Sequence, residues 1–322
     1  MRRCSIPQTS AACICLPGSA NTDFYTGIHH AENIGRLMRP DNPLLPNYKH
    51  VPIGYHGRSS SIRLSGRDVP RPNGQTKAPD QDAPLFGPTR RLDYELEMGI
   101  WIGAGNELGH AIPIGEAQQH IAGLAILNDW SARDVQIWEY QPLGPFLAKS
   151  FMSSISPWIV TTDALEPYRV AQPPRADGDP TPLPYLMDPG DQTRGAYDVR
   201  MEVHLLTSAM RASGAPPYRL SRGSMLAMYW TAAQLVAHHT SNGCNLCPGD
   251  LVGTGTLSGS SEDSFGSLIE LTYGGKQPLL LPGGEIRTFL EDGDELIMIA
   301  YAQAPGRARI GFGECRARVV GQ

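Results

Sequence analysis

The segment Leu92–Met98 carries the strongest chemical signal in this sequence. Its pattern predicts a strand, and because successive side chains of a strand point to opposite faces, Glu95 and Glu97 share one face with Asp93. Neighbouring carboxylates repel each other, and a divalent cation removes that repulsion; oxygen donors are the ligands that Ca²⁺ and Mg²⁺ prefer. The alternative is an antiparallel strand with one solvated face, and the two glutamates alone do not decide between these interpretations.

A second polar cluster, Asn128–Asp134, interrupts an apolar run and brings Asp129 as a further carboxylate. The residues that follow predict a helix over Ser131–Tyr140, with Ser131 as its N-cap. Three polar side chains have the spacing of one helix face: Arg133, Gln136 and Tyr140. This face either contacts a polar ligand or is simply solvated.

Two isolated charged residues need partners. Lys149 lies among apolar residues, where an acid cluster or a bound anion could balance its charge, unless its amine reaches solvent. Glu270 lies in the apolar segment Ser267–Tyr273, which we predict as a strand, so it is either at a sheet edge or held by a base.

Gly253–Gly259 is glycine-rich but lacks the lysine of a P-loop, so nucleotide binding is rejected.

His29 and His30 lie in a predicted helix, Asp23–Met38, for which Asp23 is a plausible N-cap. Seven residues span almost two turns, so Asp23 and His30 can face one groove at about 10 Å. A lone histidine in a helix is more often a satisfied core residue than a catalytic base.

The remaining pattern favours a strand-rich chain with a few helices. Gly and Pro are frequent (35 and 28 of 322 residues) and separate runs of Val, Ile, Thr and Tyr. We predict a long helix over Ser224–His239, a hairpin turn at Gly274-Gly275 and further short helices and strands. The main predicted strands are Ala122–Leu127, Val199–Leu206, Leu251–Thr254, Leu279–Leu281, Glu295–Gln303 and Arg316–Val320.

Composition excludes several classes of protein. The net charge of −5 gives no sign of a nucleic-acid-binding surface, and no apolar window is long enough for a membrane span. The stretch from Arg2 to Leu16 only loosely mimics a signal peptide. Six cysteines are too few for a disulfide scaffold, and Cys244 and Cys247, with Cys13 and Cys15, make a poor zinc set, so reduced thiols in the cytoplasm are expected.

Read in order, the motifs resemble the fumarylacetoacetate hydrolase family from about residue 20 to the C-terminus. They are Asp23-Phe24-Tyr25, His30, the run Gly54–Ser60 (GYHGRSS), Glu95-Leu96-Glu97, Asn128–Asp134, Trp138-Glu139-Tyr140, Pro142–Phe146, Lys149-Ser150-Phe151, Asn242–Asn245, Gly255-Thr256 and Arg309–Gly313. The resemblance implies an α+β fold, mainly β, of the mixed β-sandwich roll type of that family's C-terminal domain. It also implies a homodimer that acts on a small β-diketo acid. The reaction would be metal-dependent hydrolysis of the carbon–carbon bond of 4-fumarylacetoacetate to fumarate and acetoacetate, the last step of tyrosine and phenylalanine breakdown.

The resemblance also implies roles for individual residues. The Ca²⁺ ligands would be Asp23, Glu95, Glu97 and Asp129, and a Mg²⁺ site would involve Asp129, Lys149 and Ser153. His30 would be the general base, oriented by Glu270. The oxyanion-stabilising set would be Arg133, Gln136 and Lys149. Substrate contacts would come from Tyr25, Arg39, Tyr55, Gln136, Tyr140 and Thr256.

The sequence departs from the family pattern in places. The family's N-terminal domain is expected to be absent, with residues 1–22 as a lead-in and 23–322 as the catalytic domain. Met152 replaces a usual glycine and could crowd the second metal position, Ser153 replaces a threonine, and Cys247 stands where a basic residue is usual. Two alternatives stay open: an acylpyruvate hydrolase or oxaloacetate decarboxylase, and an inactive form that only binds metal or a partner subunit.

Overall fold

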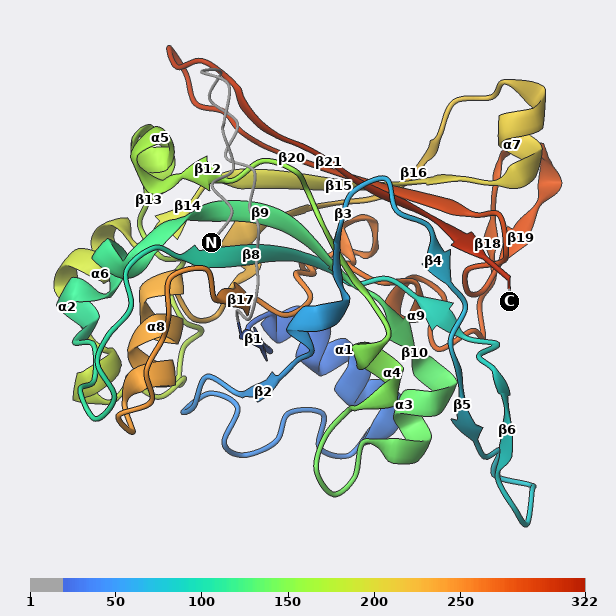
Figure 1. Cartoon of the computed structure of the whole chain (residues 1–322), viewed down its shortest axis with the longest axis horizontal. Coiled ribbons are helices and arrows are strands. Elements are labelled where there is room, and N and C mark those ends of the chain that lie inside the picture. Colours follow the sequence, from blue (N-terminus) through green and yellow to red (C-terminus); the bar gives the residue numbers. More distant parts are fainter. Residues whose placement is uncertain (1–19, 322) are drawn as a thin grey trace, which may run out of the picture.

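The computed structural model describes residues 20–321, which form two packed sheets with helices around them (Figure 1). Along the larger sheet, the strands run in the order β2 (Gly54–His56), β1 (Asn21–Phe24), β17 (Leu251–Gly253), β8 (Leu96–Ile102), β9 (Ile121–Asp129), β11 (Ser153–Ile155) and β3 (Ile62–Leu64), and β12 (Val160–Thr161) also pairs with β9. β1 pairs with β17 in parallel, whereas β8 is antiparallel to both of its neighbours, β17 and β9. The sheet is therefore mixed.

The smaller sheet packs against the larger one, mainly against β9. Its order is β16 (Tyr218–Ser224), β15 (Val199–Leu206), β20 (Glu295–Ala302), β21 (Ile310–Val320) and β4 (Val69–Pro70). Four two-stranded pairs complete the strands: β7 (Leu92–Asp93) with β10 (Ser131–Ala132), β5 (Asn73–Thr76) with β6 (Leu85–Pro88), β13 (Arg169–Val170) with β14 (Ala196–Tyr197), and β18 (Leu279–Leu280) with β19 (Ile286–Arg287). The β5–β6 hairpin projects from the body of the molecule (Figure 1).

The helices lie outside the sheets and are mostly short. They are α1 (Ile28–Met38), α2 (Ile114–Ala117), α3 (Arg133–Glu139), α4 (Leu147–Ser150), α5 (Thr162–Leu165), α6 (Pro189–Arg194), α7 (Ser208–Ser213), α8 (Ala232–Thr240) and α9 (Leu268–Leu271). Within residues 20–321, none of them combines the length and apolar character that crossing a bilayer requires. The predicted fold class, strand-rich α+β, is confirmed.

Both faces of β8 and β9 are buried. On one face, Met98 and Ile126 join the main hydrophobic core that lies between the two sheets. On the other face, Trp101, Ala125 and Leu127 form a smaller apolar cluster inside the curl of the larger sheet. The strand that contains Glu97 therefore has no solvated face, which rules out the half-exposed alternative.

Several predicted elements are correct and others need correction. Val199–Leu206 is a strand with the predicted bounds, but Asp23–Met38 is not one helix: β1 ends at Phe24, and α1 begins at Ile28. Asp23 is thus a strand residue and not a helix cap. Ser267–Tyr273 was predicted as a strand but forms the short helix α9, so Gly274-Gly275 turns the chain after a helix and not within a hairpin.

Two further helices are shorter than predicted. α3 begins at Arg133, because Ser131 pairs with Asp93 in the β10–β7 ladder and therefore cannot cap the helix. α8 begins only after Thr231, whose side chain and Gln234 form a capping box. Cys244, Cys247 and Cys315 are free thiols, as expected, whereas Cys13, Cys15 and the Arg2–Leu16 stretch lie outside the described residues.

Candidate metal centre and active site

Four carboxylates converge inside the curl of the larger sheet. Their oxygens lie within 4.8 Å of one another, all four side chains are buried, and we call them the acid cluster: Asp23, Glu95, Glu97 and Asp129. Strands of the larger sheet supply them, since Asp23 is on β1, Glu97 on β8 and Asp129 at the end of β9, while Glu95 lies in the break between β7 and β8. Segments far apart in the sequence thus meet because their strands lie close together in one sheet, with only β17 between β1 and β8.

The carboxylates strongly perturb one another. Burial, and then the charge of Asp129, raise the pKa of Asp23 from 3.8 to about 7. Burial, together with Asp23 and Asp129, raises the pKa of Glu97 well above its ordinary value. Burial also acts on Glu95, but Lys149 and Arg133 outweigh it and hold the pKa of Glu95 well below its usual range. The cluster therefore holds more negative charge than the protein alone stabilises.

Two buried cations border the acid cluster. Lys149 Nζ contacts Glu95 Oε2 and lies 2.8 Å from Asp129 Oδ2. Arg133 Nη1 donates to Glu95 Oε1 at 2.7 Å and to Gln136 Oε1 at 3.1 Å. Lys149 is thus paired with acids and does not reach solvent, and the polar face that begins with Arg133 is turned toward the cluster.

The groups around the acid cluster leave room and free oxygen atoms for a hard cation. Glu97 Oε1 is buried and has no hydrogen-bond partner. The backbone next to it has no side chain at Gly253. A Cβ at this position would lie 2.5 Å from Asp23 Oδ1 and 3.1 Å from Glu97 Oε2. The N–H of Gly255 donates to both of these carboxylates at 3.2 Å. An all-oxygen, strongly anionic donor set of this kind suits Ca²⁺ or Mg²⁺.

His30 and Glu270 form a buried pair. His30 Nδ1 lies 2.7 Å from Glu270 Oε2, and Glu270 also accepts hydrogen bonds from Asn33, Ser258 and Ser267. Burial alone would raise the pKa of Glu270, but His30 and the other donors outweigh it and lower it. An ionised carboxylate only accepts hydrogen bonds, so we place the imidazole proton on Nδ1, which leaves Nε2 free to accept one.

Of the predicted substrate-contacting residues, Tyr25 and Tyr55 contact members of these groups directly. The Tyr25 ring packs edge-on against His30 at a centroid distance of 5.6 Å, and Tyr55 donates to Asp129 Oδ2 at 3.2 Å. Tyr140 is half-buried and follows α3 directly, one turn beyond Gln136. Arg133 Nη2, Arg39 Nε and Thr256 Oγ1 are buried without hydrogen-bond partners. Such groups are rare in folded proteins and are expected where a ligand completes them.

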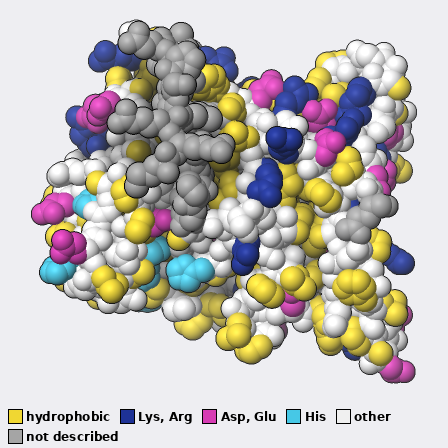
Figure 2. Space-filling view, in the orientation of Figure 1, with side chains coloured by type: hydrophobic (Ala, Val, Ile, Leu, Met, Phe, Trp, Pro, Cys, Tyr) yellow, Lys and Arg dark blue, Asp and Glu magenta, His cyan; other side chains and the backbone are white. Residues whose placement is uncertain are grey.

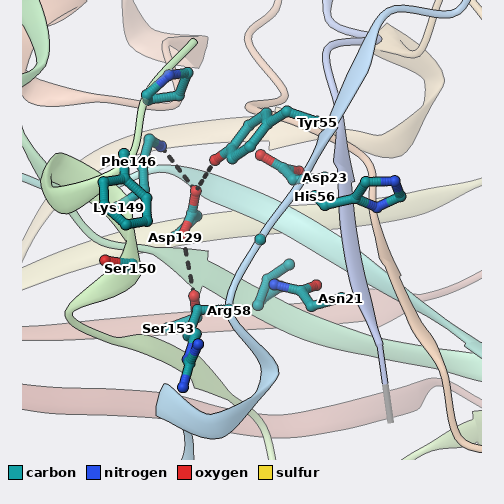
Figure 3. Close-up of a pocket in the computed structure, with 13 residues that line it drawn as sticks. Asn21, Asp23, Tyr55, His56, Arg58, Asp129, Phe146, Lys149, Ser150 and Ser153 are labelled. Carbon is teal, nitrogen blue, oxygen red and sulfur yellow. Dashed lines mark hydrogen bonds and ion pairs between the residues drawn. The ribbon is translucent and has the colours of Figure 1, made fainter. Parts of the chain in front are cut away.

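A cavity of about 180 Å³ opens beside the acid cluster (Figure 3). It is bordered by Asp23, Asp129, Tyr55, Lys149 and Ser153, whose hydroxyl donates to Asp129 Oδ1 at 3.0 Å. His30 and Arg133 do not line it. Met152 directly precedes β11 and belongs to the main hydrophobic core, and it does not line the cavity.

Sequence reasoning missed several residues of the site. Among the residues that line the cavity without a predicted role are Asn21, His56, Arg58 and Phe146. His56 and Arg58 belong to a motif that the sequence singled out, but no periodicity indicated which way their side chains point. The sequence predicted that Asp93 shares a face with the two glutamates. It did not indicate its hydrogen-bond donors, because residues 133, 268 and 269 are distant in the chain.

Comparisons with known proteins agree with this site. Residues 22–320 match the family model described as fumarylacetoacetate (FAA) hydrolase C-terminal. The chain is 45% identical to the fumarylacetoacetase of Homo sapiens and 47% identical to that of Arabidopsis thaliana, in each case over 99% of this chain and 74% of the relative. The relative from Caenorhabditis elegans is 46% identical over 99% of this chain and 75% of its own length.

Solved structures show the same fold at lower identity. A fumarylpyruvate hydrolase from Pseudomonas aeruginosa, in complex with Mn²⁺ and pyruvate, superposes with a TM-score of 0.54 at 18% identity over 100% of both chains. A fumarylacetoacetate hydrolase from Exiguobacterium antarcticum gives a TM-score of 0.51 at 19% identity, over 94% of this chain and 75% of that one. By its matched length, its identity to curated relatives and its fold, this chain belongs to the fumarylacetoacetate hydrolase family.

Proposed function

We propose that this protein hydrolyses the carbon–carbon bond of 4-fumarylacetoacetate to fumarate and acetoacetate with the help of a divalent cation. One observation carries the proposal: a buried acid cluster lies beside two buried cationic side chains in a chain about 45% identical to fumarylacetoacetases. In the net reaction, water adds its hydroxyl to the fumaroyl carbonyl carbon. The electron pair of the broken bond then leaves on the acetoacetate carbon, which takes up a proton.

The acid cluster would hold the cation, which we propose to be Ca²⁺. A Mg²⁺ site would adjoin it at Asp129 and Ser153, with Lys149 acting through its charge and not as a ligand, because an ammonium group has no lone pair to offer. A bound cation would supply Lewis-acid polarisation of substrate oxygens. The neighbouring lysine then limits how much negative charge the site presents to an anionic substrate.

His30 is the proposed general base. Its free Nε2 can accept a proton from water, while Glu270 fixes the tautomer and stabilises the imidazolium that forms. This function needs an ionised Glu270, and the lowered pKa of that carboxyl supports it. The full burial of the pair keeps the ring in one orientation.

The oxyanion that develops on the attacked carbonyl needs fixed donors. Arg133, Gln136 and Lys149 are the proposed set, and Arg133 Nη2 is already buried with no partner. In comparable sites, loss of one such donor costs about 2.7–4 kcal/mol. Tyr25, Arg39, Tyr55, Tyr140 and Thr256 would bind the remaining oxygens of the diacid, and the unpartnered donors on Arg39 and Thr256 support this role.

The test is turnover by purified protein supplied with Mg²⁺ or Ca²⁺. Loss of the ultraviolet absorbance of fumarylacetoacetate is followed beside oxaloacetate and acylpyruvate controls. Turnover of fumarylacetoacetate alone supports the proposal. Turnover of either control instead favours the acylpyruvate hydrolase or oxaloacetate decarboxylase alternative, and no turnover by a folded, metal-binding protein favours the inactive form.

We also propose a cytoplasmic homodimer. Large apolar side chains are exposed on the β5–β6 hairpin and on the loop before α4, among them Phe86, Leu143 and Phe146, and yellow atoms gather over the hairpin in Figure 2. Exposed apolar surface of this kind is typical of protein–protein contacts. Light scattering coupled to gel filtration measures the assembly, and a monomeric mass at micromolar concentration would contradict it.

A further inference from the structure

Asp93 is a buried carboxylate that lies next to the acid cluster but is not part of it. Its side chain is 0% exposed, and four N–H groups donate to its two oxygens. Oδ1 accepts from the backbone of Tyr94 and Leu268, both at 2.8 Å. Oδ2 accepts from Arg133 Nε at 2.8 Å and from the backbone of Ile269 at 3.0 Å. Every lone-pair direction of the carboxylate is therefore directed at a specific donor.

One of these contacts fixes the guanidinium of Arg133. Asp93 accepts from Nε, whereas Glu95 and Gln136 accept from Nη1. Contacts on two sides of a planar, rigid group determine both its position and its plane. The third nitrogen, Nη2, is buried and is left without a hydrogen-bond partner. The backbone strengthens this arrangement, since Asp93 and Ser131 pair in the ladder that leads into α3.

The other contacts fix the turn that carries Glu270. Leu268 and Ile269 open the short helix α9, and their N–H groups have no acceptor within the helix. Asp93 accepts from both. Glu270 is the next residue along the chain, and it holds His30 at 2.7 Å. A displacement of the Asp93 carboxylate would therefore move the Glu270–His30 pair as well as Arg133.

We propose that Asp93 is a positioning residue that sets the imidazole of His30 and the guanidinium of Arg133 in one geometry. The inference rests on the proposed hydrolytic function, since it assigns the two groups it positions to proton transfer and to oxyanion stabilisation. Asp93 contacts Arg133 through Nε and reaches His30 only through Glu270, and it lies outside the four-carboxylate set. Its contribution is therefore expected in kcat and not in metal affinity.

The experiment compares Asp93→Asn with Asp191→Asn in the full-length protein. The first change keeps the shape of Asp93 but turns an N–H group toward donors that need an acceptor. Asp191 is the matched control, a buried carboxylate on α6 that accepts from Thr231 at 2.8 Å and takes no part in the proposed site. Three quantities are measured: kcat and KM with fumarylacetoacetate, the Kd for Ca²⁺ by calorimetry, and the downfield NMR signal of the His30 Nδ1 proton in protein labelled with ¹⁵N-histidine.

A positioning role predicts that Asp93→Asn lowers kcat by about 10²-fold, the effect of a misplacement near 1 Å, with little change in KM. The Kd for Ca²⁺ stays close to that of the parent, and the His30 signal shifts or broadens. Asp191→Asn changes none of the three. The proposal is overturned by parental kcat and an unmoved His30 signal in Asp93→Asn, by an equal loss of kcat in both variants, or by loss of Ca²⁺ binding in Asp93→Asn.

Two provisions keep the result decisive. If Asp93→Asn does not fold, Asp93→Glu replaces it, because this change keeps the charge and only shifts the carboxylate; the same fall in kcat and shift of the His30 signal are expected, and their absence refutes the role. If the parent protein does not turn over fumarylacetoacetate, the proposed function fails. The His30 signal then decides the positioning role alone, since an unchanged signal in either Asp93 variant contradicts it.

Discussion

Removing divalent cations should make the stability of this protein fall steeply as pH rises from 5 to 7. The cause is the acid cluster, in which burial and the charge of Asp129 raise the pKa of Asp23 from 3.8 to about 7. The pKa of Glu97 is raised as well, for similar reasons. Between the unfolded and folded pKa values, these carboxyls are ionised when the chain is unfolded but protonated when it is folded.

The direction in which stability changes with pH follows from the number of protons bound by the folded and unfolded states. The folded state holds more protons than the unfolded state in this window, so the free energy of unfolding decreases as pH rises. One such group lowers it by about 1.36 kcal/mol per pH unit, hence about 2.7 kcal/mol between pH 5 and 7. The full rise of the pKa of Asp23 from 3.8 to about 7 corresponds to about 4 kcal/mol. Glu95, whose pKa is lowered, stays ionised throughout the window and adds no slope.

A bound cation reverses the trend, because its ligands must be deprotonated and binding therefore tightens with pH. The assay is urea unfolding at pH 5, 6, 7 and 8, with a chelator in one series and with excess Ca²⁺ or Mg²⁺ in the other. The stability gained from the cation should grow with pH. In the double variant Asp23→Asn, Glu97→Gln, the slope in chelator should become much smaller, and within the acid cluster only the raised pKa of Asp129 should still contribute to it. Equal stability at pH 5 and 7 in chelator, or a cation effect that does not depend on pH, would refute this account of the cluster.

Three further changes test separate parts of the site. His30→Ala should abolish turnover while the Kd for Ca²⁺ measured by calorimetry is retained; loss of binding together with activity would make His30 a ligand or a structural residue. Gly253→Ala should weaken Ca²⁺ binding by about tenfold or more, because its Cβ would lie 2.5 Å from a ligand oxygen, whereas Gly87→Ala, which meets nothing within 4 Å, should leave the Kd unchanged. Lys149→Met should cost about 3–5 kcal/mol in urea unfolding with chelator, since it leaves buried carboxylates unpaired, and added Ca²⁺ should recover part of that loss. An equal loss with and without Ca²⁺ would show that Lys149 acts through packing and not through charge.

The local sequence pattern was sufficient to predict the elements that pair with regular strands. The strand Val199–Leu206 alternates along a ladder with β16 and β20, and its bounds follow from its sequence. The convergence of Glu95 and Glu97 was also predictable, although Glu95 lies just outside the strand and reaches the cluster through the break between β7 and β8. These two residues are close in sequence, so short-range geometry was enough.

Predictions failed where distant partners decide the local conformation. The segment Ser267–Tyr273 has the composition of a strand but turns into a helix, because Asp93 accepts hydrogen bonds from its first amides. Asp23 reads as a helix cap, but pairing with Leu251–Gly253 draws its segment into the sheet. No window of sequence contains these contacts. The roles proposed for His30 and Arg133 came from family resemblance, and spacing alone would not have assigned them.

The position of β1 has a consequence for how long the protein survives in a cell. Asp23 is the one member of the acid cluster near the start of the described chain, and the other three lie at residues 95–129. A cation bound by these side chains would therefore cross-link β1 to the segment that carries residues 95–129. Without that ion, β1 keeps its backbone pairing with β2 and β17 but loses the link between Asp23 and the three later acids. A shortage of the metal is therefore expected to speed proteolysis of the chain and so to shorten the lifetime of the protein.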